Sequence, residues 1–96
     1  MAKYELTVVV AGNVEEETLV ATLEKSKSFI TDFGGQITDV KDYGKKRLAY
    51  EIQKQTEGYY YFIQFDAETT VPAEIEARLR IQENVIRFMC VRLDEE

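Results

Sequence analysis

The stretch Gly44-Lys45-Lys46-Arg47-Leu48-Ala49-Tyr50-Glu51-Ile52 decides how the middle of this chain folds. After three adjacent cations, large apolar side chains recur at every second position: Leu48, Tyr50 and Ile52. This is the period of a half-buried β-strand. A glycine inside a strand commonly marks a bulge or bend, so we predict an interruption at Tyr43-Gly44. The stretch therefore completes a strand that runs over residues 36–53.

A turn and a second strand follow on the C-terminal side. Gln55-Thr56-Glu57-Gly58 has the composition of a hairpin turn. Residues 59–65 then carry large apolar side chains at both odd and even positions. We expect a strand here that is apolar on both of its faces.

A helix and a last strand complete this half of the chain. Thr69-Thr70-Val71-Pro72 presents hydroxyls just before a proline that suits the first turn of a helix. Ile75 and Leu79 mark the buried side of that helix. We expect Asn84 to end it and residues 85–93 to form the final strand.

The N-terminal half has the same order of elements. Residues 3–10 alternate, with these side chains on one face: Tyr4, Leu6, Val8 and Val10. A helix is predicted over residues 14–33, with Asn13 as its N-cap, Glu16 as the capping-box partner and Glu15-Glu16-Glu17 in its first turn. Gly34-Gly35 supplies the left-handed residue that stops it. One apolar stripe of this helix is formed by Leu19, Leu23, Ser26, Ile30 and Phe33.

The element order is therefore strand, helix, strand, strand, helix, strand. Two split βαβ units of this kind make an α+β, ferredoxin-like two-layer sandwich, in which both helices cover one face of a four-stranded antiparallel sheet. We predict a single domain over residues 1–96. The uncovered face of the sheet is the place to look for function.

Net charge and charge distribution limit the partners. The chain carries 12 Lys and Arg against 18 Asp and Glu, a net charge of −6, so as a whole it repels nucleic acid. Its cations are segregated from its acids, and most of them fall at Lys45-Lys46-Arg47 and at the arginines 78, 80, 87 and 92. Any contact with RNA must therefore be local.

The usual parts of catalytic and metal sites are missing from the sequence. There is no histidine and no Gly-rich phosphate loop. Acylphosphatase-like enzymes share this sandwich but resemble one another in an Arg that follows the first strand, where this chain has Ala11-Gly12-Asn13-Val14. The only cysteine, Cys90, has no partner for a disulfide or a metal and is interpreted as a core residue. We expect no enzyme activity, no metal, no cofactor and no small-molecule substrate.

No apolar run approaches the ~20 residues that span a bilayer. The N-terminus enters a strand pattern at once, without a secretory signal. We therefore expect a cytoplasmic protein that makes no contact with a membrane.

The third strand decides what the open face presents. If Tyr60 and Phe62 face the helices, then Tyr59, Tyr61 and Ile63 lie on the open face. They would form an apolar patch there with Val9, Met89 and Val91, edged by Arg87 and Thr7. Such a patch favours a protein-partner site.

Aromatic residues on a sheet also suggest an RNA-recognition motif, but Glu57-Gly58-Tyr59-Tyr60-Tyr61 has an acid where that motif needs a base and a tyrosine where it needs a small residue. Lys45-Lys46-Arg47 has two interpretations: a solvated strand edge kept unpaired by charge, or a set of phosphate contacts shared with Arg80 and Arg87.

Several motifs together resemble one family, the bacterial small-subunit ribosomal protein conventionally numbered six. The resemblance covers nearly the whole chain and rests on these segments: Lys3-Tyr4-Glu5, Gly44 through Ile52, Gly58-Tyr59-Tyr60 and Leu79 through Arg87. Two departures from the family are the residues around Ile52 and the short acidic end at Glu96.

This resemblance implies a structural protein of the small ribosomal subunit that binds the central domain of 16S rRNA as a heterodimer with small ribosomal protein eighteen. The partner is basic in this family, which accounts for the acidity of the chain. The candidates for RNA contact are Lys3, Lys45, Lys46, Arg47, Arg80, Arg87 and Arg92. The candidates for partner contact are Leu48, Tyr50, Tyr59 and Tyr61. A ferredoxin-like regulatory or ligand-binding homodimer stays open as the alternative.

Overall fold

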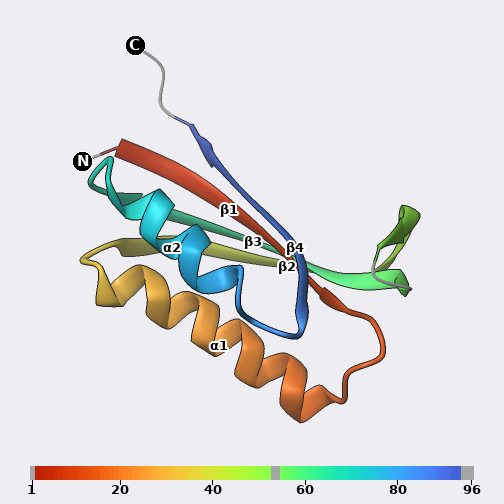
Figure 1. Ribbon diagram of the computed structural model, residues 1–96. Coiled ribbons are helices and arrows are strands. Elements are labelled where there is room, and N and C mark those ends of the chain that lie inside the picture. The colour runs from red at the N-terminus through yellow and green to blue at the C-terminus, as the bar shows by residue number, and fades with distance from the viewer. Residues whose placement is uncertain (1, 53–54, 94–96) are drawn as a thin grey trace.

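The computed structural model describes residues 2–52 and 55–93 and has the predicted βαββαβ order. Its elements are β1 (Ala2–Ala11), α1 (Glu16–Asp32), β2 (Gln36–Ile52), β3 (Gln55–Ala67), α2 (Val71–Leu79) and β4 (Val85–Arg92). The strands form one antiparallel sheet in the order β2-β3-β1-β4. Both helices lie on the same side of this sheet (Figure 1). The prediction of a ferredoxin-like two-layer sandwich is confirmed.

The main core lies between the sheet and the helices. The predicted inward set of β1 is buried there, because Leu6, Val8 and Val10 are all 0% exposed. Ile75 and Leu79 of α2 are buried against them, as their spacing predicts. In the part of the chain that the structure describes, no helix covers the other face of the sheet, so the contacts between the two layers all lie on the helix side.

Helix α1 begins later than its sequence predicts. Glu15 stands at the N-cap position and makes no side-chain capping bond, so the prediction that Asn13 caps the helix is wrong. The reason is tertiary: the Ala11 amide donates to the Asn84 carbonyl at 2.9 Å, and the Gly12 amide donates to the Glu57 carbonyl at 3.2 Å. These bonds hold the start of the loop against two other segments.

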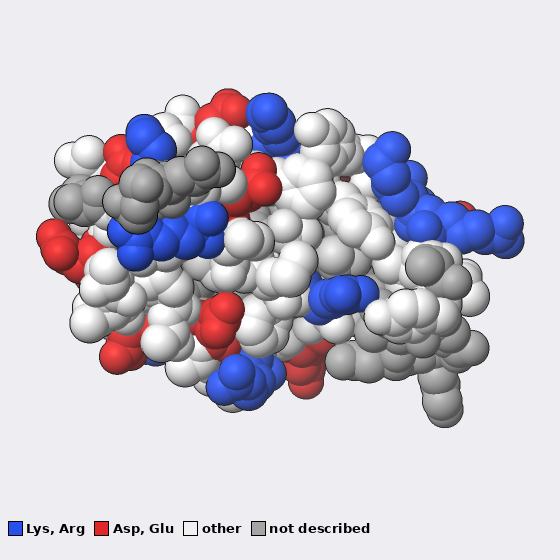
Figure 2. Space-filling view, turned by 90° about the horizontal axis from the view of Figure 1, so that it is seen from above, with Lys and Arg blue, Asp and Glu red and all other residues white. Residues whose placement is uncertain are grey.

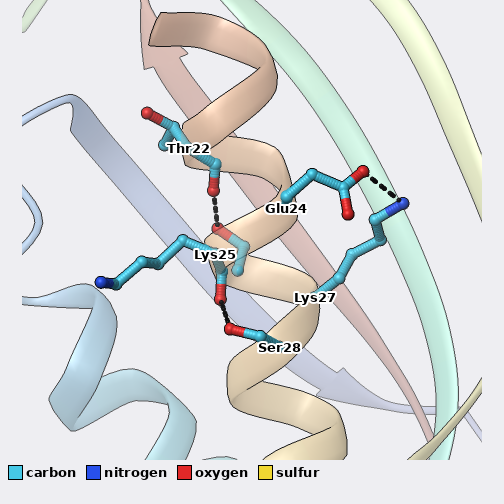
Figure 3. A network of polar contacts seen from close by, with 6 residues as sticks. Thr22, Glu24, Lys25, Lys27 and Ser28 are labelled. Atoms are coloured by element: carbon cyan, nitrogen blue, oxygen red, sulfur yellow. Dashed lines mark hydrogen bonds and ion pairs between the residues drawn. The ribbon is translucent and has the colours of Figure 1, made fainter.

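Polar residues inside α1 are satisfied by the helix itself. Ser26, a member of the predicted apolar stripe, is 1% exposed and its hydroxyl donates to the Thr22 carbonyl at 2.9 Å. Figure 3 shows this bond, the similar bond from the Ser28 hydroxyl to the Lys25 carbonyl, and an ion pair between Lys27 and Glu24. At the C-terminal end, Gly34 has φ +89°, which confirms the predicted left-handed stop.

Helix α2 is shorter than predicted. It ends at Leu79, so the prediction that Asn84 ends it is wrong. The Ile81 amide donates to the Arg78 carbonyl at 3.4 Å and the Gln82 amide to the Leu79 carbonyl at 3.0 Å, which are tight turns rather than helical bonds. Asn84 instead ties the loop to the end of β1.

The β2–β3 hairpin is longer than predicted. Arg47 pairs with Glu57 and Ile52 with Gln55, so residues 55–58 belong to β3 and the prediction of a turn there is wrong. Positions 53 and 54, which connect the strands, lie outside the described residues. The predicted bulge is confirmed: the pairing register shifts between Asp42 and Gly44.

Candidate functional site

The register between β1 and β3 decides which tyrosines face the helices. Val8 lies directly opposite Tyr61, and Leu6 lies opposite Ile63. Residues directly opposite one another in a sheet share a face, so Tyr61 and Ile63 join the main core, where they are 4% and 0% exposed. Tyr59 packs against the same core. The prediction that Tyr59, Tyr61 and Ile63 lie on the open face is wrong, and Tyr60 takes that place.

The open face keeps the rest of its predicted apolar patch. Val9 and Tyr60 pack together in a second cluster separate from the main core, and Met89 and Val91 are 51% and 44% exposed. A hollow of about 210 Å³ lies among these side chains, lined by Thr7, Val9, Tyr60, Arg87, Phe88 and Met89. Figure 2 shows uncharged side chains over most of the centre of this view, with charged side chains mainly around its edge. This is a surface of the size and chemistry that accepts an apolar side chain of a partner.

Aromatic side chains extend the patch toward β2. Phe62 contacts Tyr43 edge-to-face, with ring centroids 4.9 Å apart. Tyr43 is 48% exposed and sits at the bulge, where β2 accommodates one more residue than β3. The open face therefore carries aromatic surface on β2 and β3 and aliphatic surface on β4.

The end of the β2–β3 hairpin projects beyond the rest of the sheet and contacts it through side chains. We call residues 44–52 of β2 and 55–58 of β3 the hairpin arm; in Figure 1 it is the green segment that extends beyond the other strands. Leu48 of the arm is 7% exposed and packs in the second cluster with Val9, Ala11 and Ile86. The Arg87 guanidinium donates to the Tyr50 hydroxyl at 3.1 Å. These two side-chain contacts join the arm to β1 and β4, beside the backbone bond from the Gly12 amide to the Glu57 carbonyl.

The arm gathers four of the predicted RNA-contact residues. Lys45, Lys46 and Arg47 are exposed on it, and Arg87 of β4 is brought to it by Tyr50. Lys45 is partly neutralised, because its Nζ lies 3.7 Å from a carboxylate oxygen of Glu57. An exposed ion pair of this kind is weak, about 0–1 kcal/mol, and is readily exchanged for a phosphate.

The remaining predicted cations lie elsewhere. Lys3 pairs with Asp66 at 3.6 Å, and Arg92 lies opposite Tyr4 at the same end of the sheet. Six residues of extended strand separate Lys3 from Val9, the position opposite Arg87, which is about 20 Å. The Arg80 guanidinium lies 6.0 Å from the ring centroid of Phe88, which packs against the main core on the helix side. The seven cations therefore do not form one site.

The predicted partner residues likewise do not form one exposed surface. Leu48 and Tyr61 are buried within the chain and present almost no surface to another protein. Tyr59 is half-buried beneath Lys45, whose Nζ lies 5.6 Å from the ring centroid. Tyr50 alone is well exposed, at 63%. The sequence pattern did not place Tyr60 and Phe62 on the open face, because alternation cannot choose a face for a strand that is apolar on both.

Two groups have perturbed acidity, and neither is suited to proton transfer at neutral pH. Burial, with smaller effects from the nearby Asp42 and Tyr59, raises the pKa of Tyr61. Burial and the Glu76 carboxylate raise the pKa of the half-buried Cys90 thiol to about 11. Within residues 2–52 and 55–93, no three His, Cys, Asp or Glu side chains are grouped so that they could hold a metal ion. None of the helices in the same residues is long and apolar enough to cross a membrane.

Comparisons with known proteins agree over nearly the full chain. The family model described as Ribosomal protein S6 matches residues 3–92. A protein of Moorella thermoacetica named small ribosomal subunit protein bS6 is 44% identical, over 100% of this chain and 98% of its own length. The protein of the same name from Heliobacterium modesticaldum is 38% identical, over 100% of both chains. The crystal structure of 30S ribosomal protein S6 from Thermotoga maritima matches with a TM-score of 0.91 at 32% identity, covering 96% of this chain and 87% of that one.

Proposed function

Because the chain belongs to the ribosomal protein S6 family, we propose that it is a structural constituent of the bacterial small ribosomal subunit that binds the central domain of 16S rRNA together with small ribosomal protein eighteen. The match of the family model to residues 3–92, which include the hairpin arm and the open face, carries this proposal. A chain with this function resides on the ribosome in the cytoplasm and has a structural rather than a catalytic role.

The hairpin arm is the part of the surface best suited to phosphate contacts. Lys46 and Arg47 are exposed, and in the described part of the chain neither makes an ion pair. Lys45 and Arg87 lie nearby, so the arm and its surroundings offer up to four cations to RNA backbone that passes along it. Contacts of this type position a protein on RNA without reading its sequence.

The net charge of the chain indicates that these contacts alone do not give tight binding to rRNA. A chain of net charge −6 repels the RNA at long range, and the few phosphates that the arm can neutralise give weak, salt-sensitive binding. A basic partner removes this repulsion. We infer that the heterodimer, rather than the isolated chain, is the species that binds rRNA.

The open face of the sheet is the surface that we assign to the protein partner. Tyr60, Met89 and Val91 expose apolar area next to the hollow, and Arg87 and Thr7 supply polar groups at its edge. An apolar centre with a polar rim is the usual arrangement of a protein interface. Tyr50 lies where this surface meets the arm, so a partner seated here also approaches the RNA-contact residues.

A pull-down of the tagged full chain from a bacterial lysate, with and without ribonuclease, tests the proposal. We expect 16S rRNA and small ribosomal protein eighteen to be recovered without ribonuclease, and the protein partner alone to persist after it. Recovery of neither molecule contradicts the proposal. A monodisperse homodimer that is indifferent to RNA would support the regulatory alternative, and turnover of an acyl phosphate would support an enzyme of the acylphosphatase type.

A further inference from the structure

Among the described side chains of the hairpin arm, that of Leu48 is the buried one that packs on the body of the protein. Leu48 is 7% exposed, whereas its neighbours Lys46, Arg47 and Tyr50 are all exposed. Its contacts are with Val9, Ala11 and Ile86 in the second cluster, not with the main core beneath the helices. Leu48 therefore contributes little to holding the helices on the sheet.

The missing side chain of Gly58 leaves room in the second cluster. A Cβ on Gly58 would lie 2.6 Å from Cγ1 of Val9, which is too short for two carbon atoms that are not bonded, and 3.6 Å from a terminal methyl of Leu48, which is an ordinary contact distance. Glycine at position 58 thus makes room for the Val9 side chain, and the Leu48 methyl packs beside the same point.

The sheet alone does not fix the direction of the arm. The register between β2 and β3 shifts at the bulge between Asp42 and Gly44, and it shifts again between Arg47 and Ile52. Gly44 has φ +74°, in the left-handed region where the strand bends. Bulges re-aim a strand, so contacts beyond the hairpin help to hold the arm in place. The Gly12 amide donates to the Glu57 carbonyl on the β3 side of the arm, and on the β2 side Leu48 packs in the second cluster while Arg87 donates to the exposed Tyr50 hydroxyl.

We propose that Leu48 is a positioning residue for RNA binding: by seating in the second cluster it holds Lys45, Lys46 and Arg47 in the arrangement that meets the phosphate backbone. This inference rests on the proposed function. Side chains alternate along a strand, so with Leu48 turned toward the open face, Lys46 shares that face and Arg47 points to the opposite one. When Leu48 is packed in the second cluster, the arm presents these cations already ordered. An arm without this contact must be ordered during binding, which lowers affinity.

A double-mutant cycle tests the proposal. Binding of the full chain to a transcript of the central domain of 16S rRNA, in the presence of small ribosomal protein eighteen, is measured for four proteins: the native chain, Leu48→Ala, the triple variant with Lys45, Lys46 and Arg47 replaced by Ala, and the combination. We expect Leu48→Ala to weaken binding about tenfold in the native background and to have almost no effect in the triple background. The salt dependence of Leu48→Ala should match that of the native chain, because its cations are retained.

Controls separate positioning from a general loss of stability. Leu48→Met keeps the side-chain volume and should restore native affinity. Val71→Ala opens a cavity in the main core at the start of α2 and should lower the melting temperature without weakening RNA binding. If Leu48→Ala does not fold, the milder Leu48→Val is judged by the same cycle.

Each outcome decides a different point. Equal losses from Leu48→Ala in both backgrounds, or no loss in either, overturn the positioning role. Unchanged affinity and salt slope in the triple variant overturn the phosphate role of the arm, which belongs to the proposed function, and the positioning role falls with it. The expected pattern, a loss that depends on the three cations, supports the inference.

Discussion

Adjacent tyrosines on β3 should respond in opposite ways when each is replaced by alanine. Tyr61 points into the main core and is 4% exposed, whereas Tyr60 is half-buried on the open face beside the hollow. Tyr61→Ala should therefore reduce the stability of the chain, and Tyr60→Ala should reduce its affinity for the protein partner. The two side chains are chemically identical, so each variant is the control for the other.

The expected magnitudes follow from burial. Removing a buried aromatic side chain costs about 3–5 kcal/mol, since the lost contacts and the residual cavity add. That is a large part of the roughly 5–15 kcal/mol by which a domain of this size is stable. Tyr60 keeps part of its ring in water, so its truncation should cost about 1–1.5 kcal/mol of stability, near half of full burial. As a central interface aromatic it should contribute about 2 kcal/mol to partner binding, a loss of about 30-fold.

Urea unfolding followed by circular dichroism measures the first effect, and a calorimetric titration with small ribosomal protein eighteen measures the second. At an m value of about 2 kcal/mol/M, Tyr61→Ala should lower the urea midpoint by roughly 2 M. The assignment of faces is refuted if Tyr60→Ala destabilises the chain as much as Tyr61→Ala does. The assignment of the partner to the open face is refuted if Tyr60→Ala binds the partner with native affinity.

Two further perturbations have defined outcomes. Gly44→Ala should cost about 1–2 kcal/mol of unfolding free energy, because φ +74° is unfavourable for a residue with a Cβ. Gly44→Asn should cost less. Equal urea midpoints for the native chain and Gly44→Ala would contradict the expectation that a Cβ is strained at this position. The pKa of Cys90 is raised from its ordinary 9.0 to about 11, so the folded state holds this proton more tightly. The unfolding free energy should then be unaffected by this group below about pH 9 and should fall as the pH rises toward 11. Cys90→Ala should remove part of that loss and leave the part due to Tyr61, whose pKa is also raised; an identical pH profile for the variant would exclude a role of Cys90.

The fold was readable from the sequence wherever one face of an element is apolar and the other is polar. The alternation of Tyr4 through Val10 and the spacing of Ile75 and Leu79 each identified a buried side correctly. Gly34 and Gly44 were found because a left-handed residue has a strong local preference for glycine. These features depend on neighbours in the sequence, which is why local patterns are enough to predict them.

The errors arose where distant segments decide the structure. Residues 59–65 are apolar on both faces, so only the pairing of Tyr61 with Val8 chooses the buried set. Asn13 has the right chemistry for an N-cap, but neighbouring backbone bonds to Asn84 and Glu57 hold the loop and delay the helix. No local pattern reports a bond between residues that are more than forty positions apart.

The candidate site was predicted in composition but not in arrangement. Lys45, Lys46 and Arg47 are exposed as expected, yet Leu48, predicted to contact the partner, is the residue that seats the arm. Its burial depends on Val9, Ala11 and Ile86, which come from other strands, and on the register shifts along β2. The distance between Lys3 and the arm likewise follows from the sheet, not from the order of residues in the chain.

A central-domain 16S rRNA transcript can be titrated with the chain alone and with the chain plus small ribosomal protein eighteen, over a range of salt concentrations. We expect weak binding by the chain alone and tight binding by the pair. Replacing Lys45, Lys46 and Arg47 by Ala should lower the slope of log affinity against log salt for the pair by about 2–3, at roughly 0.7–0.9 for each phosphate contact. Tight binding by the chain alone, or a slope that the triple variant leaves unchanged, would contradict the proposed function.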